Sequence, residues 1–153
     1  MAIQTVGIIG AGTMGNGIAQ ACAVSGIDVV MVDISEAAVP KGVATVSGSL
    51  DRLIKKEKLT EADKAAALAR IKTSTDYAAL QGAQLVIEAA TENYELKVKI
   101  LKQLDALLDA DVIVATNTSS ISITQLAAVT GRADKFIGMH FFNPVPMMAL
   151  VEI

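Results

Sequence analysis

The sequence is poor in cysteine, in aromatic residues and in surplus charge, and each shortage excludes a class of protein. A single cysteine, Cys22, cannot form an internal disulfide and fits a reducing compartment. Tryptophan is absent and only two tyrosines and three phenylalanines occur, so the core must be aliphatic. A net charge of −3 lacks the basic excess of a general nucleic-acid binder, and we expect no nucleic-acid partner.

Long hydrophobic runs are also scarce. The residues before Asp28 carry no charge, which gives this stretch the hydropathy of a signal peptide or a membrane span. A secretory signal needs a basic leading region, however, and none is present. Glycines at positions 7, 10, 12, 15, 17 and 26 fit a strand followed by a helix instead. We therefore expect a soluble protein without a membrane partner.

The 153 residues, 52% of them apolar, suffice for one domain with a real core. Short aliphatic runs alternate with segments whose apolar residues recur every three or four positions. The predicted strands are 3–9, 28–32, 71–74, 83–88, 111–115 and 135–140. The predicted helices are 14–25, 36–58, 61–70, 93–109 and 122–130. This alternation predicts a doubly wound α/β fold of the Rossmann type with a mostly parallel sheet.

The connection from the second strand to the third, residues 34–71, is longer than one crossover helix requires. We interpret it as an inserted helical pair joined near Leu59 and Thr60, with Thr60 as the N-cap of the second helix. Residues 51–72 hold seven of the thirteen basic residues and four acidic ones. The pair is therefore locally basic in an acidic protein.

The strongest local motif is Gly10-Ala11-Gly12-Thr13-Met14-Gly15, which follows a predicted strand and opens a helix. Gly10 permits a tight turn, Gly12 lets the backbone approach a pyrophosphate, and Gly15 permits close packing of helix on sheet. The amino end of the helix then offers free amides and a positive dipole to phosphates. This pattern predicts a dinucleotide site.

Asp33 ends the next strand, eighteen residues after Gly15. A carboxylate at this spacing accepts hydrogen bonds from the adenosine ribose and repels a 2′-phosphate, which predicts NAD rather than NADP. The alternative is an ordinary strand-to-helix turn in which Asp33 caps the next helix.

The only histidine, His140, lies where we expect the sixth strand to end. The fifth strand is followed by Thr116-Asn117-Thr118-Ser119-Ser120, and ligands of open α/β sheets bind at this edge. The alternative is a hydrogen-bonded core histidine beside hydroxyl groups that cap a helix. One His and one Cys cannot supply the usual ligands of a transition-metal site, so we expect no metal.

Taken together, the glycine loop, Asp33, the segment 88–93, the segment 116–120 and His140-Phe141-Phe142-Asn143-Pro144 resemble the NAD-binding domain of the L-3-hydroxyacyl-CoA dehydrogenase family. Within that family the resemblance is greatest to the bacterial 3-hydroxybutyryl-CoA dehydrogenases. It covers the whole chain and implies NAD-dependent hydride exchange between an L-3-hydroxyacyl-CoA and a 3-oxoacyl-CoA.

The resemblance also implies roles for individual residues. His140 resembles the catalytic base, Glu152 the carboxylate that orients it, and Ser119 the serine that binds the substrate oxygen. Residues near the nicotinamide half of NAD would be Glu92, Lys97, Asn117, Ser119 and Asn143. Ser49 and Lys56 match positions that contact coenzyme A.

The family has a second, largely helical domain that closes the substrate cleft. Residues 1–153 would be the dinucleotide-binding domain alone, because the chain stops inside the apolar run Leu150-Val151-Glu152-Ile153. The resemblance implies a homodimeric parent protein in the cytoplasm. Two alternatives stay open, a β-hydroxyacid-type dehydrogenase on the same fold and a relative that binds NAD without turnover.

Overall fold

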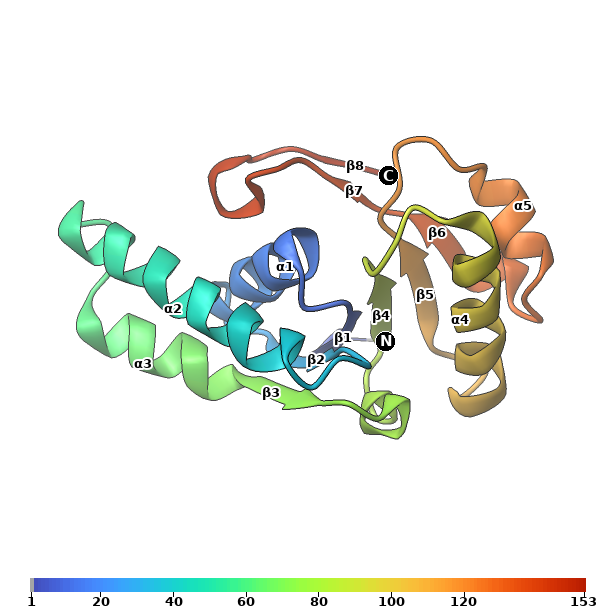
Figure 1. Cartoon of the computed structure of the whole chain (residues 1–153), viewed down its shortest axis with the longest axis horizontal. Coiled ribbons are helices and arrows are strands. Elements are labelled where there is room, and N and C mark those ends of the chain that lie inside the picture. Colours follow the sequence, from blue (N-terminus) through green and yellow to red (C-terminus); the bar gives the residue numbers. More distant parts are fainter. Residues whose placement is uncertain (1) are drawn as a thin grey trace.

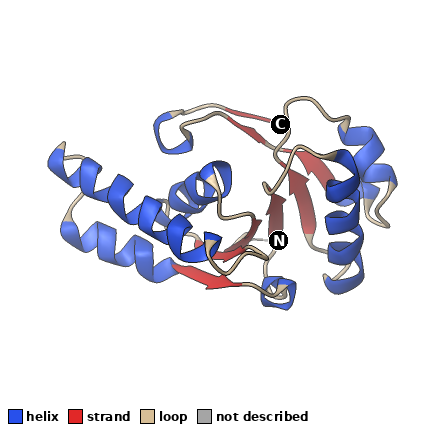
Figure 2. Cartoon of the chain, viewed as in Figure 1, coloured by secondary structure: helices blue, strands red, loops and turns tan. Residues whose placement is uncertain are grey.

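The computed structural model describes residues 2–153 and contains one six-stranded parallel sheet with helices on both faces (Figures 1 and 2). The order of the strands across the sheet is β3-β2-β1-β4-β5-β6. The strands are β1 (Thr5–Ile9), β2 (Asp28–Val32), β3 (Ile71–Ser74), β4 (Leu85–Glu88), β5 (Ile113–Thr116) and β6 (Phe136–Gly138). The helices are α1 (Thr13–Val24), α2 (Ala38–Lys55), α3 (Glu61–Arg70), α4 (Tyr94–Leu107) and α5 (Ile123–Ala128). The doubly wound α/β prediction is confirmed.

The central strands β1, β4 and β5 are almost entirely buried, as a parallel sheet between two helical layers requires, whereas the edge strand β3 is partly exposed. In β1, Val6 and Ile8 belong to the core cluster beneath α1, α2 and α3, whereas Ile9 belongs to the cluster beneath α4 and α5. The chain reverses its direction of winding between the adjacent strands β1 and β4. Ligands of such sheets bind outside the carboxyl ends of the strands at this switch point.

The inserted helical pair is present and projects from the side of the sheet beside α1 (Figure 1). Thr60 caps α3 as predicted: its hydroxyl accepts from the amide of Asp63 at 3.1 Å, and the Asp63 carboxylate accepts from the amide of Thr60. Lys64 of α3 pairs with Asp51 of α2 at 2.6 Å. The capping box therefore fixes where α3 begins, and the ion pair joins α3 to α2.

Several predicted boundaries differ from the observed ones, such as the end of α2 at Lys55 rather than 58, and two of the differences have identifiable reasons. Helix α2 begins at Ala38 rather than at residue 36, because Pro40 lacks an amide proton and is tolerated only in the first turn of a helix. Strand β6 ends at Gly138, and His140 is not its last residue. His140 and Phe141 instead form β7, which pairs antiparallel with β8 (Val151–Glu152).

The hairpin of β7 and β8 lies over α1, outside the main sheet (Figure 1). Its turn contains a cis peptide bond between Asn143 and Pro144 and a short 3₁₀ helix, Val145–Met147. A Cβ atom added to Gly17 of α1 would lie 3.0 Å from Cβ of Val145, so the glycine admits close contact between helix and turn. Among residues 2–153, no helix combines the length and the apolar character needed to cross a bilayer.

Candidate functional site

The glycine loop between β1 and α1 has the backbone geometry that its residues predict. Gly10 has φ of +106°, and a Cβ atom there would lie 2.7 Å from the carbonyl oxygen of Ala89. A Cβ atom on Gly15 would lie only 1.8 Å from the carbonyl oxygen of Gly10, so no larger residue fits. The first glycine therefore makes the turn, and the last brings α1 against it.

Gly12 is different, because a Cβ atom there would have no heavy atom of the described chain within 4 Å beyond its immediate neighbours. The glycine is the N-cap of α1, no side chain of residues 2–153 caps it, and the first turn contains no acidic residue. Open space in front of uncapped helix amides suits a phosphate group. The loop therefore fits the pyrophosphate of a dinucleotide.

Asp33 follows β2 at the same edge of the sheet and is partly exposed. One carboxylate oxygen accepts from the amide of Ala11 at 3.0 Å, and the other accepts from the amide of Ser35 at 2.9 Å. Asp33 thus stabilises the turn after β2 and also holds the glycine loop, but it does not cap α2, whose N-cap is Ala37. Each oxygen keeps a second lone pair with which it can accept from a ribose hydroxyl.

A pocket of about 210 Å³ lies where β4, β5 and β7 end beside the start of α1. It gathers most of the residues expected near the reacting groups, and Phe141 and Phe142 complete its wall. The expected residues in it are Glu92, Asn117, Ser119, His140 and Asn143, and Met14 of the glycine loop joins them, whereas Glu152 and Lys97 do not line it. These residues come from four separate parts of the sequence, and only the fold brings them together.

His140 is held on the hairpin rather than on the main sheet. It faces Glu152 in the register of β7 and β8, with Nδ1 of His140 3.7 Å from Oε2 of Glu152. The Phe142 ring lies beside the imidazole, with ring centroids 4.5 Å apart. With Nδ1 turned toward Glu152, Nε2 is the ring nitrogen available to a molecule in the pocket.

The loop after β5 is held to both of its neighbours. Oδ1 of Asn117 accepts from the amide of Phe141 at 2.9 Å, which ties the end of β5 to β7. The hydroxyl of Thr118 donates to Glu92 at 2.8 Å, which ties the same loop to the segment after β4. Ser119 lies between these anchors and is exposed, and its hydroxyl has no partner among the described residues. The hydroxyl is therefore available to a ligand.

Lys97 is not in the pocket. Its side chain is fully buried, and its ammonium group bonds to the equally buried Glu88 carboxylate and to Thr116 Oγ1. Thr116 donates to Glu88 as well, at 2.8 Å, and Glu88 also accepts from the amide of Ala90. The cluster joins α4 to the ends of β4 and β5. The partnership of Glu88 with Lys97 is not visible in the sequence, and a nicotinamide contact for Lys97 stays a prediction.

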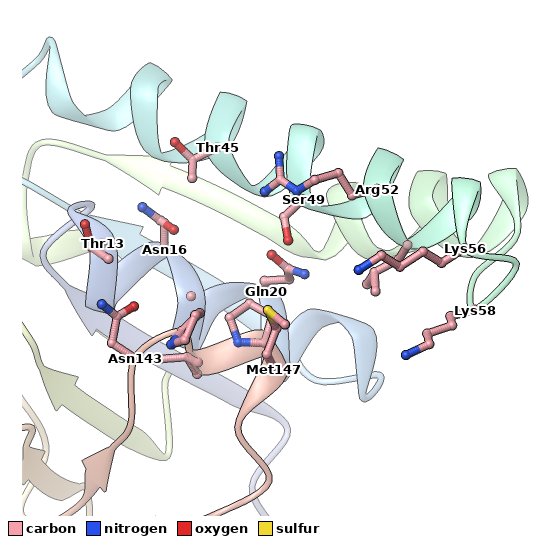
Figure 3. A pocket seen from close by; sticks show the side chains of 15 residues that line it. Thr13, Asn16, Gln20, Thr45, Ser49, Arg52, Lys56, Lys58, Asn143 and Met147 are labelled. Carbon is pink, nitrogen blue, oxygen red and sulfur yellow. The ribbon is translucent and has the colours of Figure 1, made fainter.

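A larger cavity of about 480 Å³ adjoins the first and shares Asn143 with it. It runs between α1, α2 and the Asn143–Met147 turn (Figure 3). Ser49 and Lys56, the two residues expected to contact coenzyme A, both line it. Thr45 and Arg52 lie on the same face of α2 and were not predicted. Their spacing of three or four residues from Ser49 and Lys56 is the signal that could have identified them.

Only some of the basic side chains of the helical pair line this cavity. Arg52, Lys56 and Lys58 line it. Lys64 instead pairs with Asp51, and Arg70 donates to the carbonyl oxygen of Ala23 at 3.0 Å. The basic composition of residues 51–72 therefore serves two purposes, a lined cavity and the packing of α3.

Cys22 lies in α1, away from both pockets. Burial raises the pKa of its thiol to about 11. At neutral pH the thiol is therefore protonated and a poor nucleophile.

Comparisons with known proteins identify relatives over almost the whole chain. Residues 5–153 match the family model described as 3-hydroxyacyl-CoA dehydrogenase, NAD binding domain. A 3-hydroxybutyryl-CoA dehydrogenase of Bradyrhizobium diazoefficiens is 50% identical over 99% of the chain and 52% of the relative. The mitochondrial hydroxyacyl-coenzyme A dehydrogenase of Rattus norvegicus is 46% identical over 99% of the chain and 50% of the relative.

Solved structures give the same result. The (S)-3-hydroxybutyryl-CoA dehydrogenase PaaH1 of Ralstonia eutropha is 77% identical, with a TM-score of 0.97 over 98% of this chain and 53% of the other. The chain spans about half the length of these relatives. NAD as the expected cofactor agrees with the family description. On sequence, fold and site geometry, the chain belongs to the 3-hydroxyacyl-CoA dehydrogenase NAD-binding domain family.

Proposed function

We propose that the chain is the NAD-binding part of an oxidoreductase that interconverts an L-3-hydroxyacyl-CoA and its 3-oxoacyl-CoA, such as 3-hydroxybutyryl-CoA and acetoacetyl-CoA. The proposal rests on one observation. A single pocket brings His140 and Ser119 together with Met14, at the amino end of α1. The names of the relatives, 3-hydroxybutyryl-CoA dehydrogenases among them, support the same chemistry.

When NAD is bound, it supplies the acceptor for the hydride that leaves carbon 3 of the substrate. The protein's task is to move the proton. In oxidation, Nε2 of His140 takes the proton of the alcohol, and in reduction it returns a proton to the forming alcohol. Glu152, 3.7 Å from Nδ1, orients the ring and stabilises the imidazolium charge. General acid–base catalysis of this kind contributes about 10²–10⁴ in rate.

Ser119 has the complementary task of binding the substrate oxygen. Its free hydroxyl lines the same pocket as the imidazole. A hydroxyl that donates to an oxygen whose charge changes during the reaction stabilises the charged form. His140 and Ser119 would therefore hold the oxygen from two sides, and Asn117 positions both of their segments through its bond to the amide of Phe141.

The adjoining cavity supports a coenzyme A thioester over a simple hydroxy acid. Arg52, Lys56 and Lys58 supply cationic groups along one of its walls, and Ser49 a hydroxyl. Coenzyme A carries phosphate groups at the end remote from its thioester, and cationic side chains bind phosphate. A β-hydroxyacid has a single carboxylate and no phosphates, so a wall with three cationic side chains fits the thioester better.

Asp33 supports NAD over NADP. A 2′-phosphate placed on the ribose would face the carboxylate that already holds the amide of Ala11. We therefore expect NADH to bind more tightly than NADPH, measured by titration of the nicotinamide fluorescence. An equal or greater affinity for NADPH would remove Asp33 from the assigned role.

The direct test of the proposal is oxidation of NADH in the presence of acetoacetyl-CoA, carried out on the intact protein that contains this chain. The His140→Ala variant should lose about 10²–10⁴ in kcat and keep its affinity for NADH. Turnover of a β-hydroxyacid instead of the thioester would favour the alternative dehydrogenase. NADH binding without turnover of either substrate would favour a non-catalytic relative.

We also propose that the chain works with a second, helical domain in a homodimeric, cytoplasmic enzyme. The relatives are about twice as long, which supports the second domain. The free, protonated Cys22 is compatible with a reducing compartment. Size-exclusion chromatography of the intact protein tests the dimer.

A further inference from the structure

Gln20 is a buried polar residue that the proposed chemistry does not use. It lies in α1 and is 3% exposed, yet no group of residues 2–153 forms a hydrogen bond with its side-chain amide. No fully enclosed side-chain nitrogen or oxygen of the described residues lacks a partner, so the Gln20 amide retains an opening. That opening is the 480 Å³ cavity, which Gln20 lines.

An unpaired amide in this position costs stability unless something binds it. A buried polar group without a partner loses its hydration and receives no protein hydrogen bond in return. A Leu at the same place would pack against Leu53 and Val145, two apolar residues that line the cavity. The polar residue therefore indicates a ligand with both a donor and an acceptor.

The cavity has a chemical order along its length. Figure 3 shows Asn143 at one end, Gln20 near the middle, and Lys56 and Lys58 at the other end. Asn143 also belongs to the pocket of His140 and Ser119, so the first end adjoins the reacting groups. The Ser49 side chain points from α2 toward the Gln20 amide (Figure 3). Gln20 and Ser49 thus lie between the acid–base residues and the two lysines, with the Arg52 guanidinium beside Ser49 (Figure 3).

An acyl-CoA has the same order of groups. The reacting thioester is at one end, the phosphates are at the other, and the pantetheine arm with its secondary amides lies between them. We propose that Gln20 is a specificity-determining residue that binds an amide of the pantetheine arm, with its NH₂ group donating to a pantetheine carbonyl and its oxygen accepting from a pantetheine N–H. This inference rests on the proposed acyl-CoA substrate and adds a residue that selects it.

Asn16, one turn before Gln20 on α1, lines the same cavity but is already committed to the protein. Its Nδ2 donates to the carbonyl oxygen of Ala11 at 3.3 Å, so it supports the glycine loop. Gln20 has no such bond. We therefore assign the contact with the pantetheine arm to Gln20 and not to Asn16.

The experiment compares two substrates in the intact protein, acetoacetyl-CoA and acetoacetyl-pantetheine, which keeps the amides but lacks the phosphates and the adenosine. Gln20→Leu removes the amide at similar volume. Lys56→Ala removes a charge from the phosphate end. Gln103→Leu makes the same substitution as the first variant at an exposed position on α4, away from both pockets, and serves as the matched control.

We expect Gln20→Leu to lower kcat/KM by about 5- to 30-fold on both substrates, mainly by raising KM. This change corresponds to the loss of one or two hydrogen bonds. Lys56→Ala should lower kcat/KM on acetoacetyl-CoA and not on acetoacetyl-pantetheine. Gln103→Leu should equal the unmodified protein on both. NADH affinity should be unchanged in Gln20→Leu, which shows that the fold and the cofactor site are intact.

Unchanged kcat/KM of Gln20→Leu on both substrates would overturn the inference and leave the proposed function standing. A loss confined to acetoacetyl-CoA would also overturn it, because the contact would then be with the phosphate end. If the unmodified protein turns over neither substrate, the proposed function fails, and calorimetric titration with free pantetheine decides the inference separately. Saturable binding that weakens in Gln20→Leu would uphold it, and absence of binding would overturn it.

Discussion

At the scale of single residues, the glycines of the loop after β1 are required for two different reasons. Gly15 is required by the protein itself, since a Cβ atom would penetrate the backbone of Gly10 at 1.8 Å. A Cβ atom on Gly12 would touch no other part of the described chain, so the packing there would accept a side chain. The second glycine is therefore explained by a ligand and not by folding.

This difference predicts opposite effects of the same substitution at the two glycines. Gly15→Ala should lower the free energy of unfolding by about 3 kcal/mol or more, because backbone and helix must separate. Gly12→Ala should cost less than about 1 kcal/mol of stability but weaken NADH binding roughly tenfold. Urea unfolding and fluorescence titration measure the two quantities. Equal stabilities, or unaltered NADH affinity in Gly12→Ala, would contradict the assignment.

At the scale of secondary-structure elements, two clusters of charged side chains join α4 to neighbouring strands and loops. Arg132 lies after α5 and is 5% exposed. Its guanidinium donates to the Asp105 carboxylate at 2.7 Å and to four backbone carbonyls at the end of α4 and before β5. The carbonyls are those of Asp105, Leu108, Asp109 and Val112. One side chain thus caps α4 and fixes the start of β5.

The Asp105–Arg132 pair predicts a pH dependence of stability. The hydrogen bond from Arg132, assisted by the amide of Gly131, lowers the pKa of Asp105. In the unfolded chain the pKa of an Asp carboxyl is about 3.9. Because the pKa of Asp105 is lower in the folded state, the ionised carboxylate stabilises the fold at pH values above the unfolded-state pKa. This stabilisation is lost as the pH falls through the folded-state pKa. Urea unfolding at pH 7 and below pH 4 should show a smaller acid-dependent loss in Asp105→Asn than in the unmodified chain. Identical pH profiles would exclude Asp105 as a contributor.

The second cluster, Glu88 with Lys97 and Thr116, predicts a large cost for removing one partner and a smaller cost for removing both. Lys97→Met leaves a buried, unpaired carboxylate and should lower the free energy of unfolding by about 3–5 kcal/mol. Adding Glu88→Gln to that variant removes the charge and should recover much of the loss. Chemical denaturation of the two variants tests this. A double variant no more stable than Lys97→Met would show that the charge pair is not the source of the effect.

At the scale of the whole molecule, the hairpin over α1 presents an apolar surface. Met147, Leu150 and Ile153 are exposed by 74%, 60% and 78%. Contiguous apolar surfaces of this kind mark contacts with other protein parts. The same hairpin carries His140 and Glu152. The orientation of this acid–base pair therefore depends on a segment whose apolar side chains are largely exposed.

We therefore predict that the 153-residue chain by itself binds NADH but turns over acetoacetyl-CoA poorly, and that it self-associates as its concentration rises. Steady-state kinetics at equal NADH saturation, compared with the intact protein, measure the first effect, and sedimentation velocity over a range of concentrations measures the second. Near-normal turnover by the isolated chain would contradict this and would show that the hairpin orients His140 without further support.

Much of the architecture could be predicted from local patterns. The predicted strands 28–32 and 71–74 and the predicted helix 61–70 have their observed limits, because short β-branched runs, helical periodicity and the Thr60 cap are local features of the sequence. The end of β6 could not be predicted, because it depends on which strand supplies the next hydrogen bond. Met139 bonds to Thr116 and Phe141 to Asn117, and neither contact is visible in the residues themselves.

The amino-acid sequence by itself determined the order of strands and helices, the glycine loop with its acid at Asp33, and the residue types of the site, because periodicity, turn chemistry and motif spacing are local properties. Only the tertiary structure decided that Lys97 turns inward to Glu88, that His140 stands on a separate hairpin opposite Glu152, and that Gln20 faces a cavity without a partner. These are contacts between residues far apart in the chain, and their geometry is set by the packing of whole elements.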